Sequence, residues 1–296
     1  GREEELKIFQ EALKKINNSF SGSVFYIRAH AGMGKSRLLQ KFLVMGKEYG
    51  FDCHKLHNLS FGMGTERSTL RVMVSELIGF DLSDPEDSQH VAIKTFVQSQ
   101  SLNKKDESIL YDIFGTAQPL ENKLILDAMT SEMRFQAKIE FVCNFITKLS
   151  AKTPQIFAFE DLHFADETSL TLLKNLFEET TRSGIILIAS SRLDTELLEK
   201  DFWEQSLDQR SVHVFDLKPL TSEEAYQVAK SELSADDNIL QKCVERAEGN
   251  PLFLDQLLRN ADETFEEGAV PSSIETMMIA RVDRLPTPER RALKRA

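Results

Sequence analysis

The spacing of apolar residues switches repeatedly between the period of a helix and that of a buried strand over the first 217 residues. Leu6, Phe9, Leu13 and Ile16 share one helical face, and an unbroken apolar run at 24–27 follows, which is typical of a helix leading into a covered strand. The same pattern gives strands at 51–59, 156–159, 184–189 and 211–217, and helices at 37–43, 66–78, 131–150 and 169–177. This alternation predicts an α/β fold of three layers around a parallel five-stranded sheet.

The pattern becomes purely helical near residue 219. Thr221 and Glu224 form a capping-box pattern that opens the first of these helices. Predicted helices lie at 221–233, 239–247, 251–258 and 272–285, with an acidic loop at 264–268. We therefore expect an α/β domain over 1–218 and a small all-helical lid domain over 219–296, which can include the start of a further helical or winged-helix segment.

The stretch between residues 80 and 130 carries the least information. A polar, proline-containing break at 81–88 precedes helical patterns at 91–114, and none of these segments holds a chemical motif. The sequence therefore does not indicate what this insert does.

A small-residue loop from Ala29 to Ser36 lies between the predicted strand 24–27 and the helix after it. Gly32 and Gly34 place no Cβ in the way of an approaching phosphate, and the N–H groups of the loop and helix start can point at it. Lys35 can reach the β- and γ-phosphates, while the Ser36 hydroxyl can ligate Mg²⁺. The alternative is a glycine-rich turn without a ligand. Strand, loop, Lys-Ser and helix in this order favour a nucleotide site, whose loop and helix residues are Ala31, Gly32, Met33, Gly34, Lys35, Ser36 and Arg37.

Two carboxylates, Glu160 and Asp161, close the fully apolar strand at 156–159. Carboxylates at the C-terminal end of a parallel strand lie where open α/β sheets bind ligands. We expect Glu160, together with Ser36, to hold Mg²⁺, and Asp161 to orient or deprotonate the attacking water. The alternative for an acidic pair is a solvated strand end.

The strand at 184–189 ends in Ser190, Ser191 and Arg192. A cation at the tip of a strand beside the acidic one could stabilise the γ-phosphate, so Arg192 joins Lys35, Glu160 and Asp161 as a catalytic candidate. An arginine in this position is otherwise an ordinary surface residue.

These segments together resemble one family. The opening Gly1-Arg-Glu-Glu-Glu-Leu6, the phosphate loop, Glu160-Asp-Leu-His-Phe-Ala-Asp166, Ser191-Arg192 and Glu248-Gly-Asn-Pro-Leu-Phe-Leu254 follow one another as in STAND-class, AAA+-like P-loop ATPases with an origin-recognition-like AAA domain. Phe164 stands where tryptophan is usual. The family contains ATP-driven switches found beside adenylate or guanylate cyclase, protein kinase or helix-turn-helix regulator domains.

The resemblance implies roles for residues that spacing alone does not single out. Gly1 and Arg2 would lie against the adenine, Pro251 would close over the nucleotide, and Arg192 would contact the γ-phosphate. It also implies ATP and Mg²⁺ as cofactors.

Composition narrows the class of protein. The chain has 296 residues and a net charge of −11, so its surface would repel a phosphate backbone and nucleic-acid binding by this segment is disfavoured. Cys53, Cys143 and Cys243 fit neither a disulfide framework nor zinc spacing, and His54 and His57 lack the partners of a metal site. No membrane span or signal peptide is present, so we expect a cytoplasmic segment of a longer polypeptide.

The sequence thus favours an ATP-binding, slowly hydrolysing, Mg²⁺-dependent switch that regulates a larger signalling protein. Its expected partners are ATP and ADP and other domains of the same polypeptide or partner proteins, and a nucleotide-dependent oligomer stays open. Two alternatives stay open: a nucleotide-binding scaffold that never hydrolyses, and an origin-recognition-type ATPase that loads onto DNA.

Overall fold

The computed structural model describes residues 2–19, 21–57, 69–165, 167–180, 183–193, 212–233 and 236–259. The chain divides into two compact units. One holds residues 2–30 and 35–216, and the other holds the loop residues 31–34 together with the chain from residue 217 onward. The chain passes between the units at Asp216 and Leu217, close to the boundary expected at 218/219.

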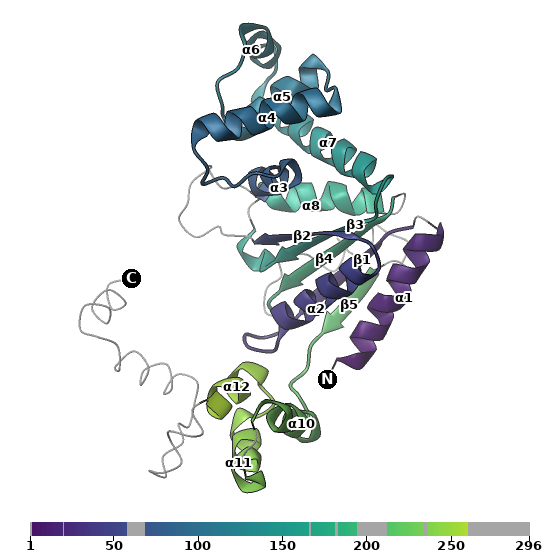
Figure 1. Cartoon of the computed structure of the whole chain (residues 1–296), viewed down its shortest axis with the longest axis vertical. Coiled ribbons are helices and arrows are strands. Elements are labelled where there is room, and N and C mark those ends of the chain that lie inside the picture. The colour runs from purple at the N-terminus through teal and green to yellow at the C-terminus, as the bar shows by residue number, and fades with distance from the viewer. Residues whose placement is uncertain are drawn as a thin grey trace, which may run out of the picture. The chain divides into compact units, whose positions relative to one another are not determined.

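The larger unit is built on a sheet of five strands in the order β2-β3-β4-β1-β5 (Figure 1). All neighbouring strands pair in parallel, which confirms the predicted parallel sheet. The strands are β1 (Ser23–Arg28), β2 (Asp52–His57), β3 (Gln155–Glu160), β4 (Ile185–Ser191) and β5 (Val212–Asp216). The second predicted strand, 51–59, is therefore shorter, and residues 58–59 lie outside the described part of the chain.

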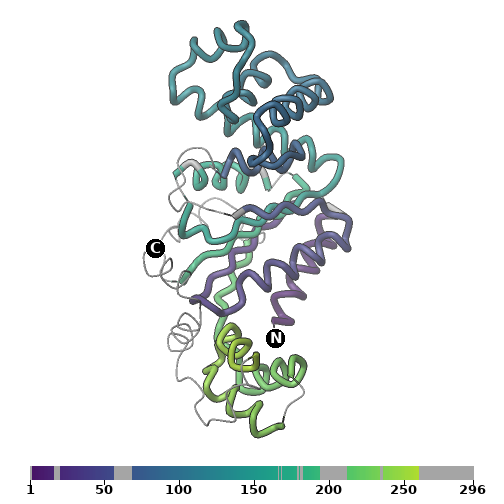
Figure 2. Tube along the Cα trace, turned by 60° about the vertical axis from the view of Figure 1, so that its left-hand side comes forward, coloured from purple at the N-terminus to yellow at the C-terminus, as the bar shows by residue number. Residues whose placement is uncertain are grey.

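Helices cover both faces of this sheet, as Figures 1 and 2 show from two directions. One layer consists of α1 (Glu3–Ser19) and α2 (Lys35–Glu48), and the other of α3 (Thr69–Ile78), α7 (Ser131–Ser150) and α8 (Glu167–Thr180). The aromatic ring of Phe9 in α1 stacks on Phe42 in α2, with 4.1 Å between centroids, and meets Phe25 of β1 edge-on. Because both faces are covered, every residue of β3 and β4 is buried, as their continuous apolar sequences predict.

The segment after α3 forms a further helical layer that packs on α3 and α7. It contains α4 (Glu86–Gln100), α5 (Lys104–Phe114) and α6 (Leu120–Asp127). The predicted polar break at 81–88 is shorter, because α4 already begins after Pro85. In α6, Leu120 and Leu124 are 73% and 62% exposed, whereas the buried Asn122 amide has no hydrogen-bond partner among the described residues.

The smaller unit holds three described helices, α10 (Ser222–Glu232), α11 (Asp237–Ala247) and α12 (Pro251–Arg259). The predicted capping box is confirmed: Glu224 N–H donates to Thr221 Oγ1 at 3.3 Å, and Thr221 N–H donates to the Glu224 carboxylate at 2.9 Å. Their apolar faces form a core of their own that includes Ala229, Leu240 and Leu254. The acidic loop expected at 264–268 and the helix expected at 272–285 lie outside the described residues.

Candidate nucleotide-binding site

The phosphate loop joins the end of β1 to the start of α2. Gly32 and Gly34 have φ of +80° and +87°, a left-handed conformation that glycine adopts without strain. A Cβ on Gly32 would also meet the Asn250 side chain, whereas a Cβ on Gly34 would meet nothing within 4 Å. Helix α2 begins at Lys35, so the backbone N–H groups of its first turn have no acceptor inside the helix. The loop therefore ends in a set of donors suited to an anion.

The Lys35 side chain folds back along this loop. Its ammonium donates to the carbonyl oxygens of Ala29 at 2.9 Å and His30 at 3.1 Å. Ser36 and Arg37, the next two residues of α2, are exposed. Lys35 is thus held at the mouth of the loop by two carbonyl groups that a phosphate oxygen can replace.

The strand order brings the other candidate residues to the same edge of the sheet. Strand β4 lies between β1 and β3, with Ile27 paired to Ser190 and Phe159 paired to Ala189. The N–H of Ala29 donates to the carbonyl oxygen of Ser191 at 3.3 Å, which ties the start of the phosphate loop to the end of β4. Within the larger unit, the residues that flank the loop, the acidic pair and the Ser190–Arg192 strand tip therefore lie at the carboxyl edge, where α/β proteins bind ligands.

Glu160 is the last residue of β3, and its side chain is only 6% exposed. One of its carboxylate oxygens lies 3.2 Å from the ammonium of Lys55, which comes from the neighbouring edge strand β2. The sequence does not reveal this ion pair, because the two residues are neighbours only through the strand order. Lys55 is therefore a site residue that sequence reasoning missed.

Asp161 differs from Glu160 in both backbone and exposure. Its φ of +52° lies in the left-handed region, which is unusual for a residue with a side chain and is found at functional turns. Its carboxylate is 48% exposed and lies 4.0 Å from Nδ1 of His163, while its backbone N–H donates to Ser190 Oγ at 3.2 Å. The sequence places Ser190 at this strand tip but assigns it no role, and the structure shows it bonded to the Asp161 backbone. Arg192 is exposed.

Residues tied to the nucleotide only by resemblance lie in both units. Arg2 precedes α1 with φ of +73°, and its guanidinium lies 3.8 Å from the Glu5 carboxylate. Gly1 lies outside the described residues. Pro251 is the first residue of α12 in the smaller unit, where it occupies the helix position at which proline costs no hydrogen bond.

Asn250 organises the start of α12. Its Oδ1 accepts from the N–H groups of Leu252 at 3.0 Å and Phe253 at 3.2 Å, which is the N-cap arrangement. In the same unit, the Leu252 N–H also donates to the Gly32 carbonyl oxygen at 3.2 Å, and Asn250 Nδ2 lies 3.5 Å from the Ala31 carbonyl oxygen. The predicted turn at 249–251 thus also contacts the middle of the phosphate loop, and no pattern in the sequence indicates this contact.

The histidine and cysteine side chains singled out in the sequence have other surroundings in the structure. Among the described residues no group of three or more His, Cys, Asp or Glu side chains could hold a metal ion. His54 is hydrogen-bonded to Gln155 at 3.0 Å. The three cysteines form no disulfide with one another, and burial raises the pKa of Cys53 to about 11.

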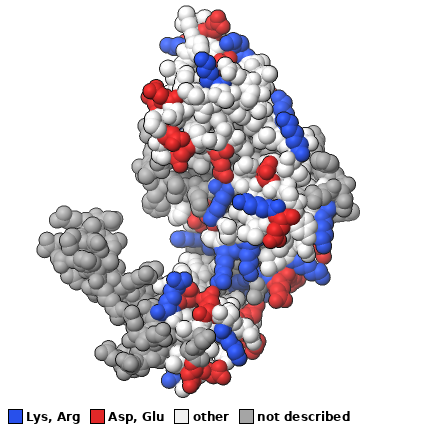
Figure 3. Space-filling view, in the orientation of Figure 1, with Lys and Arg blue, Asp and Glu red and all other residues white. Residues whose placement is uncertain are grey.

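None of the described helices has the length and apolar character to cross a bilayer. Acidic and basic side chains intermingle on the face drawn in Figure 3.

Comparisons with solved structures show the fold. The Aeropyrum pernix ORC1 protein in complex with DNA is similar over 97% of this chain and 69% of its own, at 13% identity and a TM-score of 0.53. The Aeropyrum pernix ORC2 protein, solved as ADPNP–ADP complexes, is similar over 94% and 67%, at 11% identity and a TM-score of 0.50. No curated protein matches the sequence significantly.

Structural similarity at 11–13% sequence identity shows the fold but not the family, which a match to a family model shows. The model for the AAA ATPase domain matches residues 1–188, which include the phosphate loop, the acidic pair and most of β4. The chain therefore belongs to the AAA ATPase domain family.

Proposed function

We propose that this protein is the regulatory ATPase of a larger cytoplasmic signalling protein: a switch of the STAND class that binds ATP with Mg²⁺ and hydrolyses it slowly. The observation that carries the proposal is the meeting of three features at one sheet edge. These are the left-handed glycine loop with Lys35 at the start of α2, the acidic end of β3, and the tip of β4 between them.

The described residues suit a nucleoside triphosphate. A Cβ at Gly34 would meet none of the described residues within 4 Å, α2 offers its N–H groups and positive dipole end, and Lys35 supplies a cation already at the loop. Ser36 and Glu160 would hold Mg²⁺, with water and phosphate oxygens completing its shell. When bound, Mg²⁺ neutralises charge that develops on the phosphates.

The two carboxylates have different proposed roles because their surroundings differ. Asp161 is half exposed and its turn is fixed by Ser190, so it can orient an incoming water. Glu160 is nearly buried and therefore less open to an attacking water than Asp161, so we assign it to Mg²⁺, for which it would have to exchange or share its pairing with Lys55. Arg192 is proposed to contact the γ-phosphate, and Gly1, Arg2 and Pro251 to surround the adenine.

Nucleotide binding is tested with Lys35→Ala. Loss of the loop's cation should weaken ATP binding about tenfold or more, roughly 1.4 kcal/mol, in titration calorimetry. Lys41→Ala is a matched control, because Lys41 is an exposed lysine of the same helix without a recorded partner. Equal ATP affinity in a folded Lys35→Ala protein would refute the site.

Hydrolysis is tested separately from binding. Asp161→Asn should retain ATP binding and lose phosphate release, whereas Glu160→Gln should lose phosphate release and weaken the Mg²⁺ dependence of ATP binding. If wild-type protein, assayed within its longer polypeptide, releases no phosphate above background, the scaffold that binds without hydrolysing replaces the switch.

Switching requires that ATP and ADP act differently on the protein. Hydrogen exchange measured with each nucleotide should differ at the turn 249–252, which contacts the phosphate loop, and at Ser191 and Arg192. Identical protection at both places would leave Pro251 and Asn250 with a purely structural role.

DNA loading is the second candidate, favoured by the similarity to an ORC1 protein that was solved in complex with DNA. The net charge of −11 opposes it. Binding of a fluorescent duplex that weakens steeply with salt would support this candidate, and no binding at about 50 mM salt would exclude it for this segment.

A further inference from the structure

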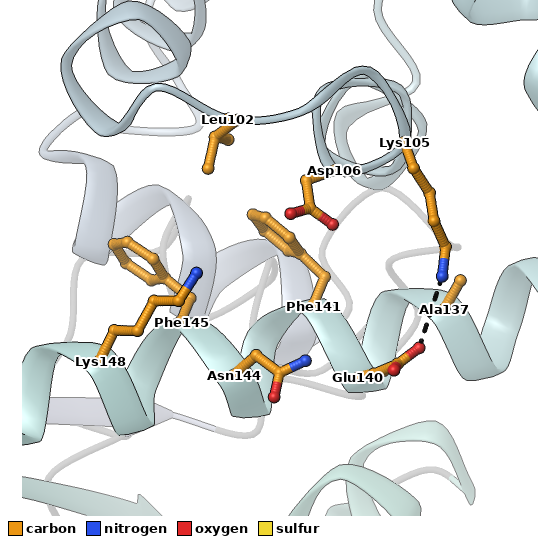
Figure 4. A pocket seen from close by; sticks show the side chains of 9 residues that line it. All are labelled: Leu102, Lys105, Asp106, Ala137, Glu140, Phe141, Asn144, Phe145 and Lys148. Atoms are coloured by element: carbon orange, nitrogen blue, oxygen red, sulfur yellow. Dashed lines mark ion pairs between the residues drawn. The ribbon is translucent and has the colours of Figure 1, made fainter.

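A cleft of about 260 Å³ lies between the start of α5 and one face of α7, in the larger unit (Figure 4). Phe141 and Phe145 of α7 form its floor, and Leu102 faces them from the segment before α5. None of the residues that line the cleft belongs to the nucleotide site described above.

The aromatic floor is held in place by its neighbours. The rings of Phe141 and Phe145 are nearly parallel, at 9°, with centroids 6.3 Å apart. Phe96 of α4 meets Phe145 edge-on at 5.0 Å. Phe141 and Phe145 are 6% and 8% exposed, so packing fixes their positions and a narrow strip of each ring is accessible from the cleft.

Most charges around the cleft are already compensated. Lys105 and Glu140 lie 3.7 Å apart and close one end, as the dashed line in Figure 4 marks. The Asp106 carboxylate accepts from Asn103 Nδ2 at 2.9 Å and lies in the first turn of α5, where the helix dipole favours a negative charge.

Two polar side chains on α7 have no such compensation. For Lys148 and Asn144 the structure records no hydrogen bond or ion pair with any other described residue. Figure 4 shows the Lys148 ammonium at the end of the cleft beside Phe145, away from the Lys105–Glu140 pair. The cleft therefore combines an apolar floor with one uncompensated cation and one available amide.

We propose that this cleft binds a small amphiphilic monocarboxylate. The carboxylate would pair with Lys148 and accept a hydrogen bond from Asn144 Nδ2, while an apolar or aromatic body covers Phe141 and Phe145. A single negative charge matches the single uncompensated lysine, whereas a doubly charged phosphate would meet the nearby Asp106 and Glu140 without a second cation. The cleft is slightly smaller than the pockets of about 300–1,000 Å³ that hold drug-sized ligands, so the ligand is a compact one.

The proposal adds a ligand site to the ATPase and does not depend on ATP binding. It is tested with 4-phenylbutyrate as the probe, in the absence of nucleotide, by ¹H–¹⁵N NMR titration of the whole chain. Shifts should saturate at roughly millimolar probe and cluster at residues 102–106 and 137–148. Shifts spread over the surface, or none at about 10 mM, would overturn the proposal.

Variants distinguish binding through the carboxylate from non-specific hydrophobic binding. Lys148→Gln should weaken binding about tenfold and Lys148→Arg should keep it within about twofold, because only the first removes the cation. Lys123→Gln, at an exposed lysine of α6 without a recorded partner, should bind as wild type. The neutral 4-phenylbutyramide should bind about tenfold more weakly than the acid. Equal binding of acid and amide, or wild-type affinity in Lys148→Gln, would refute the assignment.

Discussion

Replacing Lys55 by methionine should destabilise the protein in the absence of nucleotide. The substitution keeps the apolar stem of the side chain and removes the charge that lies 3.2 Å from the Glu160 carboxylate. Exposed ion pairs contribute up to about 1 kcal/mol, while leaving a charge buried without its partner costs about 3–5 kcal/mol. Lys55 is 32% exposed and Glu160 is 6% exposed, so this pair lies between those limits. We expect the free energy of unfolding to fall by about 2 kcal/mol.

A double-mutant cycle isolates the part of this loss that comes from the interaction between Lys55 and Glu160. Adding Glu160→Gln to Lys55→Met removes the carboxylate charge as well. The free energy of unfolding of the double variant should therefore be about 1–2 kcal/mol higher than the value expected from adding the two single losses. Urea denaturation followed by circular dichroism gives the four free energies. Lys105→Met is the control, because its pair with Glu140 is exposed on both sides and should contribute little. Additive single effects would show that Lys55 and Glu160 do not interact energetically.

Three further outcomes follow from individual residues. Burial lowers the pKa of His213, whose ring stacks on Phe25, so protonation below pH 6.5 favours the unfolded chain. The free energy of unfolding should therefore fall as pH drops below 6.5, and His213→Phe should make this fall smaller. Gly50→Ala should lower the free energy of unfolding by about 1–2 kcal/mol in thermal unfolding, because Gly50 has a positive φ. Gly249→Ala should lower it clearly more, because Gly249 also has a positive φ and a Cβ there would collide with described neighbouring atoms. Because burial raises the pKa of Cys53 to about 11, iodoacetamide should label it more slowly at pH 8 in the folded protein than in urea, and equal rates would contradict this.

Elements with a local cause were predictable from the sequence. Helix α7 runs from Ser131 to Ser150, as predicted, because Thr130 caps its start and apolar residues repeat on its inner face. The capping box at Thr221 and the five strands were predictable for the same reason: each is specified by residues a few positions apart.

Features that arise from the strand order or from tertiary packing were not predictable. Lys55 and Glu160 meet because β2 pairs with β3, and the sequence of neither strand indicates which strand lies beside it. The contact between Asn250 and the loop at Gly32 joins residues far apart in the chain. Helix α6 reverses the usual rule, since it exposes Leu120 and buries Asn122, so a hydrophobic pattern alone would have misplaced its inner face.

The position of β1 in the sheet has a consequence for how the protein is made. This strand and the phosphate loop are synthesised before β4 and β5, with which β1 pairs among the described strands. Ser23 therefore cannot pair until Ile186 has been made, nor Val24 on its other side until Val212 has been made. Contacts between such distant residues slow folding, and until they form an apolar strand stays open to wrong pairings. A chain whose synthesis stops before β4 therefore contains the whole phosphate loop but neither of the strands that pair with β1, and we expect such a fragment to aggregate rather than bind nucleotide.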